Sequence, residues 1–186
     1  MAKAYSVDEN GVPDGFEAPN LYSPQVAPDG TTRLLISASR DKIEAAHKSL
    51  LGVLDGPLGV RYLQLIDRRN EIDRREKPRG FVALDKGKEE VRNAIEVCRR
   101  LLYDDARSQF WIKGLMGDQI VLDELGMLYA YPDDPSFRNA LSSIGINEGA
   151  AATMADRDFV KVEFEADCDN EETQLISLLR MVETPE

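Results

Sequence analysis

The order of apolar patterns over residues 32–115 constrains the fold of this chain more than any other feature. Short apolar runs have the length of buried strands, whereas two longer segments repeat apolar residues every three or four positions, as on one face of a helix. The strand-like runs lie at 34–36, 60–66, 81–84 and 110–112, and the helical stripes at 43–54 and 91–102. The sequence therefore predicts strand, helix, strand, strand, helix, strand.

This order predicts the α+β class with a ferredoxin-like (split β-α-β) core. Helices on one face of an antiparallel sheet would bury both helical stripes, and right-handed crossovers leave few other connections. Asp41 and Glu44 have capping-box spacing, which predicts the start of the first helix. Gly56 and Pro57 predict its end.

Residues 116–186 predict additional strands and a C-terminal β-α extension. Asp134 followed by Pro135 has the pattern of an N-cap and a first helical position. Asp169 and Glu172 repeat the capping-box spacing ahead of an apolar stripe that reaches Val182. The expected elements are strands at 119–122, 127–131 and 159–166, helices from 135 and 169, and a loop at 144–155.

The length predicts one α+β domain over residues 32–186, with the core at 32–115 and the extension at 116–186. A domain of this size buries roughly 70% of its unfolded surface and needs no disulfide or metal to fold. Residues 1–31 are rich in proline and glycine and predict an extended N-terminal arm. Apolar residues such as Tyr5 and Phe16 leave three alternatives open: a loose tail, a segment that wraps the domain, or a contact with a partner subunit.

Charge and cysteine content limit the cellular location and the classes of partner that we expect for this protein. The net charge of −11 repels nucleic acid and anionic membranes at long range. No apolar run has the length of a membrane span, and the first residues lack the apolar region of a signal peptide. Two cysteines without paired spacing fit a reducing compartment. We therefore expect a cytoplasmic protein that binds neither nucleic acid nor membrane.

One basic stretch, residues 68–79, interrupts this acidic pattern. Acidic residues are interleaved with its arginines, so it predicts a solvated loop with internal ion pairs; an anion or partner contact is the alternative. Arg79, Gly80 and Phe81 resemble the start of the ribonucleoprotein-1 sequence of RNA-recognition motifs. Ala83 stands where that motif has its second stacking aromatic, which argues against RNA binding.

The sequence predicts no catalytic residue, metal or cofactor. His47 is the only histidine, so a Ser-His-Asp triad or a histidine metal site lacks parts, and its place on an apolar helical face favours burial. The acidic residues 167–172 carry Glu172 where a calcium loop needs glycine. The glycines match neither a P-loop nor a dinucleotide motif.

One segment is a candidate ligand site. Tyr129 and Tyr131 share one face of a predicted strand, and Asp133, Asp134 and Arg138 follow at the start of a predicted helix. A strand end, two aromatic rings and open helix amides can together frame a small polar ligand. A packed strand with a capped helix behind it is the structural alternative.

These features favour a binding or protein-interaction module. One alternative is a small cytosolic enzyme with a carboxylate and tyrosine site within 129–138. A second is an acidic inhibitor or immunity-type protein that covers a basic surface of its partner, because acidic residues are in excess near the C-terminus. We also expect a homodimer, because a sheet covered by helices on one face leaves apolar strand residues exposed on the other.

Overall fold

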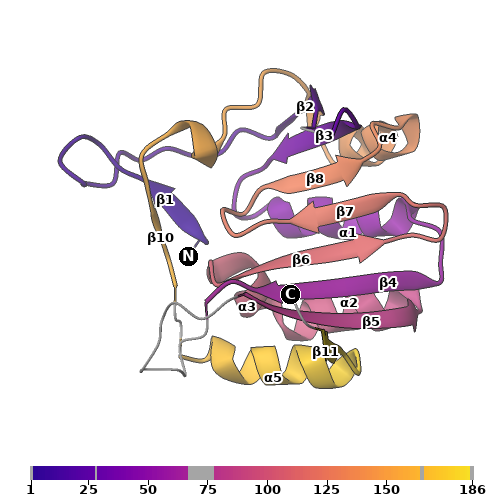
Figure 1. Ribbon diagram of the computed structural model, residues 1–186. Coiled ribbons are helices and arrows are strands. Elements are labelled where there is room, and N and C mark those ends of the chain that lie inside the picture. Colours follow the sequence, from indigo (N-terminus) through magenta and orange to yellow (C-terminus); the bar gives the residue numbers. More distant parts are fainter. Residues whose placement is uncertain (1, 28, 67–77, 164–165, 185–186) are drawn as a thin grey trace.

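The protein is built on one large, mostly antiparallel sheet. The computed structural model describes residues 2–27, 29–66, 78–163 and 166–184. Within these residues a nine-stranded sheet has the order β11-β5-β4-β6-β7-β8-β3-β2-β9, which Figure 1 shows nearly face-on. The strands are β2 (Leu21–Val26), β3 (Thr32–Ser37), β4 (Leu58–Gln64), β5 (Arg79–Lys86), β6 (Ser108–Lys113), β7 (Gln119–Leu122), β8 (Leu128–Tyr131), β9 (Asn147–Glu148) and β11 (Val182–Thr184).

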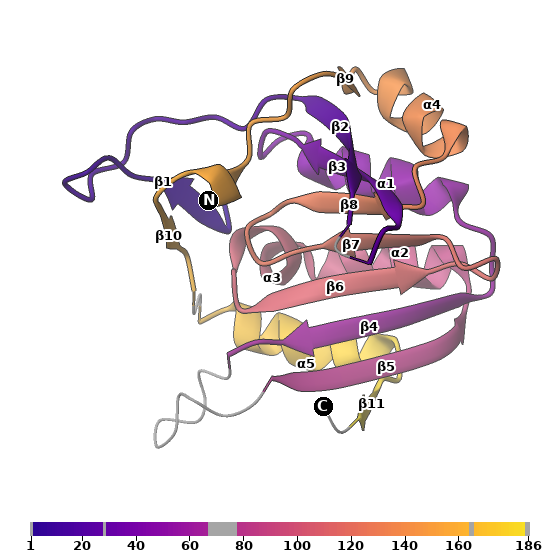
Figure 2. The same cartoon turned by 45° about the horizontal axis from the view of Figure 1, so that its top comes forward.

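The helices form a second layer behind one face of this sheet. In Figures 1 and 2, α1, α2 and α3 lie behind the central strands, with α4 and α5 beside them. Their apolar stripes and alternate strand residues such as Leu34, Val60 and Phe110 form the core, each no more than 1% exposed. The helices are α1 (Ile43–Val53), α2 (Lys88–Val97), α3 (Arg99–Asp104), α4 (Pro135–Ser143) and α5 (Cys168–Leu178), with a 3₁₀ turn η1 (Met154–Asp156).

The structure is α+β, but its strand order does not confirm the ferredoxin-like prediction. β5 and β6 are both antiparallel to β4, which lies between them, so β5-α2-α3-β6 is a split β-α-β unit. A ferredoxin-like order would place β3 in that position. Instead β6, β7 and β8 continue as a meander and β3 pairs with β8. Two of the strands assigned to an extension, β7 and β8, thus lie inside the sheet, between β3 and the split unit.

Two predicted features of the first helices need correction. The capping box at Asp41 is wrong, because α1 begins at Ile43 and Asp41 accepts a hydrogen bond from the Ser39 hydroxyl at 2.6 Å. Its expected partner Glu44 instead pairs with Lys48 at 2.9 Å. The single helix predicted over 91–102 is two helices, α2 and α3, because the backbone leaves the helical region at Cys98.

The C-terminal helix also begins and ends differently from the prediction. α5 starts at Cys168 without a side-chain cap, so the capping box at 169–172 is wrong. Glu172 is instead fully buried and accepts hydrogen bonds from the Tyr62 hydroxyl at 2.6 Å and the Gln64 amide at 2.9 Å. Val182 lies in β11 and pairs with Val82 at the sheet edge.

The N-terminal segment contributes to two different sheets. β1 (Ala4–Ser6) pairs with β10 (Phe159–Lys161) in a separate two-stranded ribbon, and β2 belongs to the main sheet. The ribbon lies beyond the ends of the central strands in Figures 1 and 2. β10 ends at Lys161, whereas the predicted strand runs over 159–166, of which residues 164–165 lie outside the described residues. β10 does not join the main sheet, because β1 is its partner.

Other sequence expectations are tested only in part. Most of the predicted basic loop, residues 67–77, lies outside the described residues. In the described part of the chain, no helix has the length and apolar character needed to cross a membrane. Cys98 is buried, as its place on the helical stripe predicts, and Cys168 is buried too; neither forms a disulfide.

Candidate functional site

The face of the sheet opposite the helices is the most distinctive surface of the molecule. We call it the open face, because neither view shows a helix over it (Figures 1 and 2). The strand registers place alternate residues of neighbouring strands in rows across this face. The longest row contains Val182, Val82, Arg61, Trp111, Val121, Tyr129 and Leu35, from β11 to β3.

Arginine side chains lie against the aromatic rings of this face. The guanidinium carbon of Arg33 is 4.5 Å from the ring centroid of Tyr129 and 5.7 Å from that of Tyr131. Arg33 also donates to the Tyr131 hydroxyl at 2.7 Å. Arg61 lies 5.9 Å from the Trp111 ring. Such cation–π contacts hold large side chains in place on a half-exposed surface.

Hydrogen bonds orient the polar tips of the same rings. The indole N–H of Trp111 donates to Gln109 at 3.1 Å, and the Gln109 amide donates to Glu124 at 2.7 Å. The Tyr129 hydroxyl donates to Asp123 at 3.2 Å. Burial and the neighbouring Asp123 charge raise the pKa of Tyr129, so its phenol stays protonated. The rings are therefore fixed in orientation before any partner arrives.

The open face is cationic and partly apolar, although the chain is acidic. Three of its strand positions carry cations, Arg33, Arg61 and Lys113. The exposed carboxylate of Asp85 lies at the β5 bulge beside Leu84, and Asp123 and Glu124 follow the end of β7. Leu84 and Val182 are each 68% exposed at the β5–β11 end. This composition contrasts with the net charge of −11 for the whole chain.

The structure divides the predicted ligand-site residues between two places. Tyr129 and Tyr131 lie on the open face beside Arg33. Asp133 and Arg138 form a bidentate ion pair, with N–O distances of 2.7 and 2.6 Å, at the start of α4. Asp134 is the N-cap of α4, as predicted, and accepts from the Ser136 amide at 2.8 Å.

These five residues therefore do not converge on one pocket. Hydrogen bonds from Ser136 lower the pKa of Asp134 and occupy its carboxylate. Arg138 also pairs with Glu148 at 2.6 Å, and its guanidinium lies 5.8 Å from the ring of Tyr22, a core residue. The polar part of the predicted site thus serves the packing of α4. The role of the two tyrosines depends on the open face.

Sequence reasoning missed a buried ionic cluster between α3, β6 and α5. The Arg107 side chain is 1% exposed and donates to Asp105 at 2.7 Å and to Asp169 at 2.6 Å. Burial disfavours its charge, but these hydrogen bonds dominate and raise the pKa of Arg107. Asp105 and Arg107 are only two positions apart, yet nothing in their pattern distinguishes them from a solvated turn. The cluster ties α5 to the sheet.

A second buried group, Lys3, attaches the N-terminal segment to the sheet. Its ammonium donates to the backbone carbonyls of Ser108 at 2.8 Å and Asp123 at 2.9 Å. Burial lowers the pKa of Lys3 to about 8 and raises that of Asp123 to about 6. Burial also lowers the pKa of nearby His47 to about 3, so this histidine is neutral beside the Tyr103 hydroxyl, 2.9 Å away.

Neither a metal site nor similarity to a known protein assigns a function to the open face or to the buried clusters. Among the described residues, no three His, Cys, Asp or Glu side chains are placed to hold a metal ion. No family model, no curated protein and no solved structure matches this chain.

Proposed function

We propose that this protein is a protein-interaction module whose open face docks onto an acidic patch of a partner protein. The observation that carries the proposal is the row of Arg61, Trp111 and Tyr129 across neighbouring strands, with no helix over it. Tryptophan, tyrosine and arginine are the residues that contribute most binding energy at protein interfaces. Because hydrogen bonds and cation–π contacts already orient these side chains, little side-chain entropy is lost on docking.

Charge supports a carboxylate-bearing partner patch. The cationic side chains of Arg33, Arg61 and Lys113 would face carboxylates across the interface, and none of the strand positions between them would repel those carboxylates. The acidic remainder of the molecule disfavours a partner that is acidic throughout. The proposal is therefore an acidic patch set in a neutral or basic surface.

The other occupants are less well supported by this face. A two-fold homodimer through the open face would bring the same three cations toward one another, which costs energy unless the faces are offset. The enzyme alternative needs tyrosine and carboxylate groups in one site, whereas Asp133 and Asp134 are held at α4. The two buried free thiols are consistent with a reducing, cytoplasmic setting, which we include in the proposal.

Site-specific photo-crosslinking in cells tests this proposal. A photoreactive residue replaces Lys113 on the open face or, as a matched control, Lys88 on α2 in the helix layer. We expect one discrete polypeptide adduct from position 113, with Asp- and Glu-rich contact peptides, and none from position 88. Adding Arg33→Glu should abolish the adduct, because it reverses a charge on the docking face.

Four outcomes would contradict the proposal. An adduct between two copies of this chain would assign the face to a homodimer. An adduct with RNA or DNA would assign it to nucleic acid. Equal adducts from positions 113 and 88, or no adduct from position 113, would show that the open face is not a specific docking surface.

A further inference from the structure

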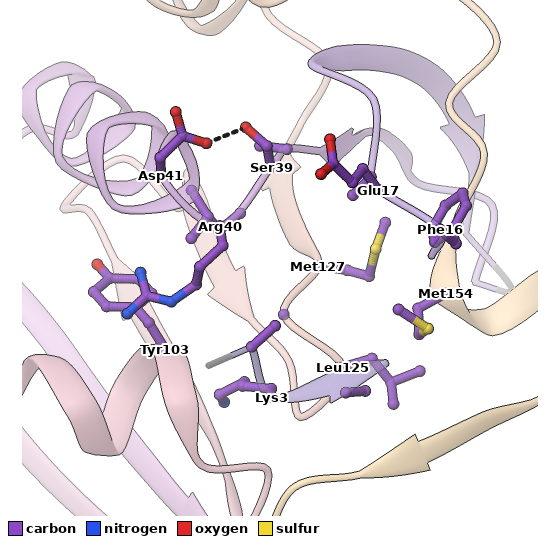
Figure 3. Close-up of a pocket in the computed structure, with 16 residues that line it drawn as sticks. Lys3, Phe16, Glu17, Ser39, Arg40, Asp41, Tyr103, Leu125, Met127 and Met154 are labelled. Atoms are coloured by element: carbon purple, nitrogen blue, oxygen red, sulfur yellow. Dashed lines mark hydrogen bonds between the residues drawn. The ribbon is translucent and has the colours of Figure 1, made fainter. Parts of the chain in front are cut away.

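A cavity lies between the N-terminal segment and the body of the domain, away from the open-face row. It has a volume of about 250 Å³ and is drawn in Figure 3. One wall comes from residues 2–4 and 16–18, and the other from the β3–α1 junction, α3 and the β7–β8 turn. This volume is slightly below the range of drug-sized sites, which suits a small ligand.

The walls of the cavity are mainly apolar and adaptable. Met127 and Met154 line it together with Phe16 and Leu125, and Figure 3 shows the two methionine side chains close to the cavity. Methionine side chains are flexible and polarisable, and they make favourable contacts with aromatic rings. The cavity therefore suits a ligand with an apolar, aromatic body.

The cations at the cavity are committed to other groups. The Lys3 ammonium donates to the Ser108 and Asp123 carbonyls, and in Figure 3 its nitrogen lies at the lower left, turned away from the methionines. Arg40 donates to the Asp104 carboxylate at 2.6 Å, and its guanidinium lies 5.9 Å from the Tyr103 ring. Neither cation is placed to receive an anionic ligand.

The carboxylates at the cavity are less committed. Glu17 lines the cavity and makes no hydrogen bond or ion pair with any residue that the structure describes. Asp41 uses one oxygen to accept from the Ser39 hydroxyl at 2.6 Å, a bond that lowers the pKa of Asp41 and keeps it ionised. Figure 3 places Glu17, Ser39 and Asp41 on the side of the cavity opposite Lys3 and Leu125. The charge available to a ligand is therefore negative.

We propose that this cavity binds a small primary amine with an aromatic body. The ammonium meets the carboxylates of Glu17 and Asp41, and the aromatic body packs against Met127, Met154 and Phe16. An anionic ligand would meet two carboxylates, and a neutral one would form no ion pair with them, because both side chains are exposed to water. Charge-assisted hydrogen bonds of this kind are roughly twice as strong as neutral ones.

Such a ligand would also bind the N-terminal segment to the body. Glu17 and Phe16 belong to that segment, whereas Asp41 and Met127 belong to the body. A ligand that contacts both sides stabilises their association by mass action. The inference is independent of the partner proposed for the open face.

Calorimetry with three matched probes tests the inference. The probes are 2-phenylethylamine, 2-phenylethanol and 3-phenylpropionate, which share the aromatic body and differ in charge. We expect saturable one-to-one binding of the amine and at least about tenfold weaker binding of the other two, which corresponds to one charge-assisted contact. Glu17→Gln should weaken amine binding by about tenfold, and Glu9→Gln, an exposed acid of the same segment outside the cavity, should not change it.

The folding of the variant and the place where the amine binds are checked on the same samples. Glu17→Gln should unfold at the same temperature as the wild type without ligand, because Glu17 has no hydrogen-bond or ion-pair partner among the described residues. Hydrogen exchange should slow in residues 4–6 and 16–18 when the amine is added. The inference is overturned if the amine does not saturate, if the alcohol or the carboxylate binds as well, if Glu17→Gln leaves the affinity unchanged, or if exchange in these segments is unaffected.

Discussion

The two faces of the central sheet differ in their environment, although the same strands form both: one face packs against helices and the other has no helix over it in Figures 1 and 2. On the helix side, Leu34, Ile36 and Ile112 are fully buried beneath α1, α2 and α3. On the open side, the alternate positions of those strands carry Arg33, Leu35 and Trp111. Strand alternation sends every second side chain to each face, so each strand encodes both environments at once.

The residue types on the open side explain how this face remains without a helical layer. Arginine, tyrosine and tryptophan combine an apolar body with a polar tip, so their bodies can be half-buried while their tips form hydrogen bonds. Arg33 covers Tyr129, and the buried Leu35 lies opposite Tyr129 in the register, with only 4% of its surface exposed. The open face is thus stable in water and still presents the residue types that dominate protein interfaces.

The largest expected difference is in the unfolding free energy that is lost when a buried arginine or an open-face arginine is replaced. Arg107→Met should cost about 3–5 kcal/mol of unfolding free energy, because it leaves the buried Asp105 carboxylate without its cation. Arg61→Met on the open face should cost less than about 1 kcal/mol, since a half-exposed charge is screened by solvent. Urea titration of both variants gives the comparison.

A double variant tests whether the Asp105 carboxylate causes the stability loss of Arg107→Met. Asp105→Leu in the Arg107→Met background should recover part of the lost stability, because it removes the buried carboxylate that has lost its arginine. Equal losses for Arg107→Met and Arg61→Met would show that the buried cluster contributes no more than a surface charge.

The next largest difference in unfolding free energy is expected between a leucine truncated in the core and one truncated on the open face. Leu101→Ala on α3 should lower the unfolding free energy by about 2–5 kcal/mol, because Leu101 is fully buried and its removal leaves a cavity. Leu84→Ala on the open face should change it by less than about 1 kcal/mol, since Leu84 is already 68% exposed. A loss below half a kilocalorie for Leu101→Ala would contradict its place in the core.

A third prediction concerns the end of the open face that the N-terminal segment covers. The pKa of Asp123 is raised to about 6 from an ordinary value near 3.8, mainly by burial. A raised folded-state pKa contributes stability that is complete below about pH 4 and is lost as pH rises through about 6. Asp123→Asn removes this titration, so it should gain about 1–3 kcal/mol relative to the wild type between pH 4 and pH 7.

Urea titrations at the two pH values measure that difference. The lowered pKa of Lys3, about 8 against an ordinary 10.5, acts above pH 7 and does not overlap this window. Glu124→Gln serves as a control, because the pKa of Glu124 is lowered despite burial by its hydrogen bond from Gln109. A variant-to-wild-type difference that is the same at both pH values would contradict the raised pKa of Asp123.

Local patterns predicted the elements better than their arrangement. The helical stripe that contains Leu50 and the apolar run at 81–84 were sufficient for α1 and β5, because side-chain periodicity is a local property. The order of the strands depends on pairings between distant residues, such as Leu35 with Tyr129, and no local pattern encodes them. For this reason the α+β class was predictable, whereas the strand order was not.

The same limit applies to the candidate surfaces. Tyr129 and Tyr131 were recognisable as residues that share a strand face, but Trp111 and Arg33 come from other strands and join them only through the sheet. Capping boxes at Asp41 and Asp169 failed because Ser39 and Arg107 compete for those carboxylates. Such competition depends on tertiary contacts, which spacing alone does not reveal.

The smallest expected effect is on nucleic acid, although the open face resembles a stacking platform more than the sequence suggests. Trp111, Tyr129 and Tyr131 place three rings on one sheet face, where a base could stack. Arg33 and Arg61 already lie against these rings, and the net charge of −11 opposes a phosphate backbone at long range. We therefore expect no change in the fluorescence anisotropy of labelled single-stranded RNA or DNA at physiological salt. Arg33→Glu and Trp111→Ser should give the same null result. Saturable binding that both variants abolish would instead assign the open face to single-stranded nucleic acid, and the acidic protein partner would be wrong.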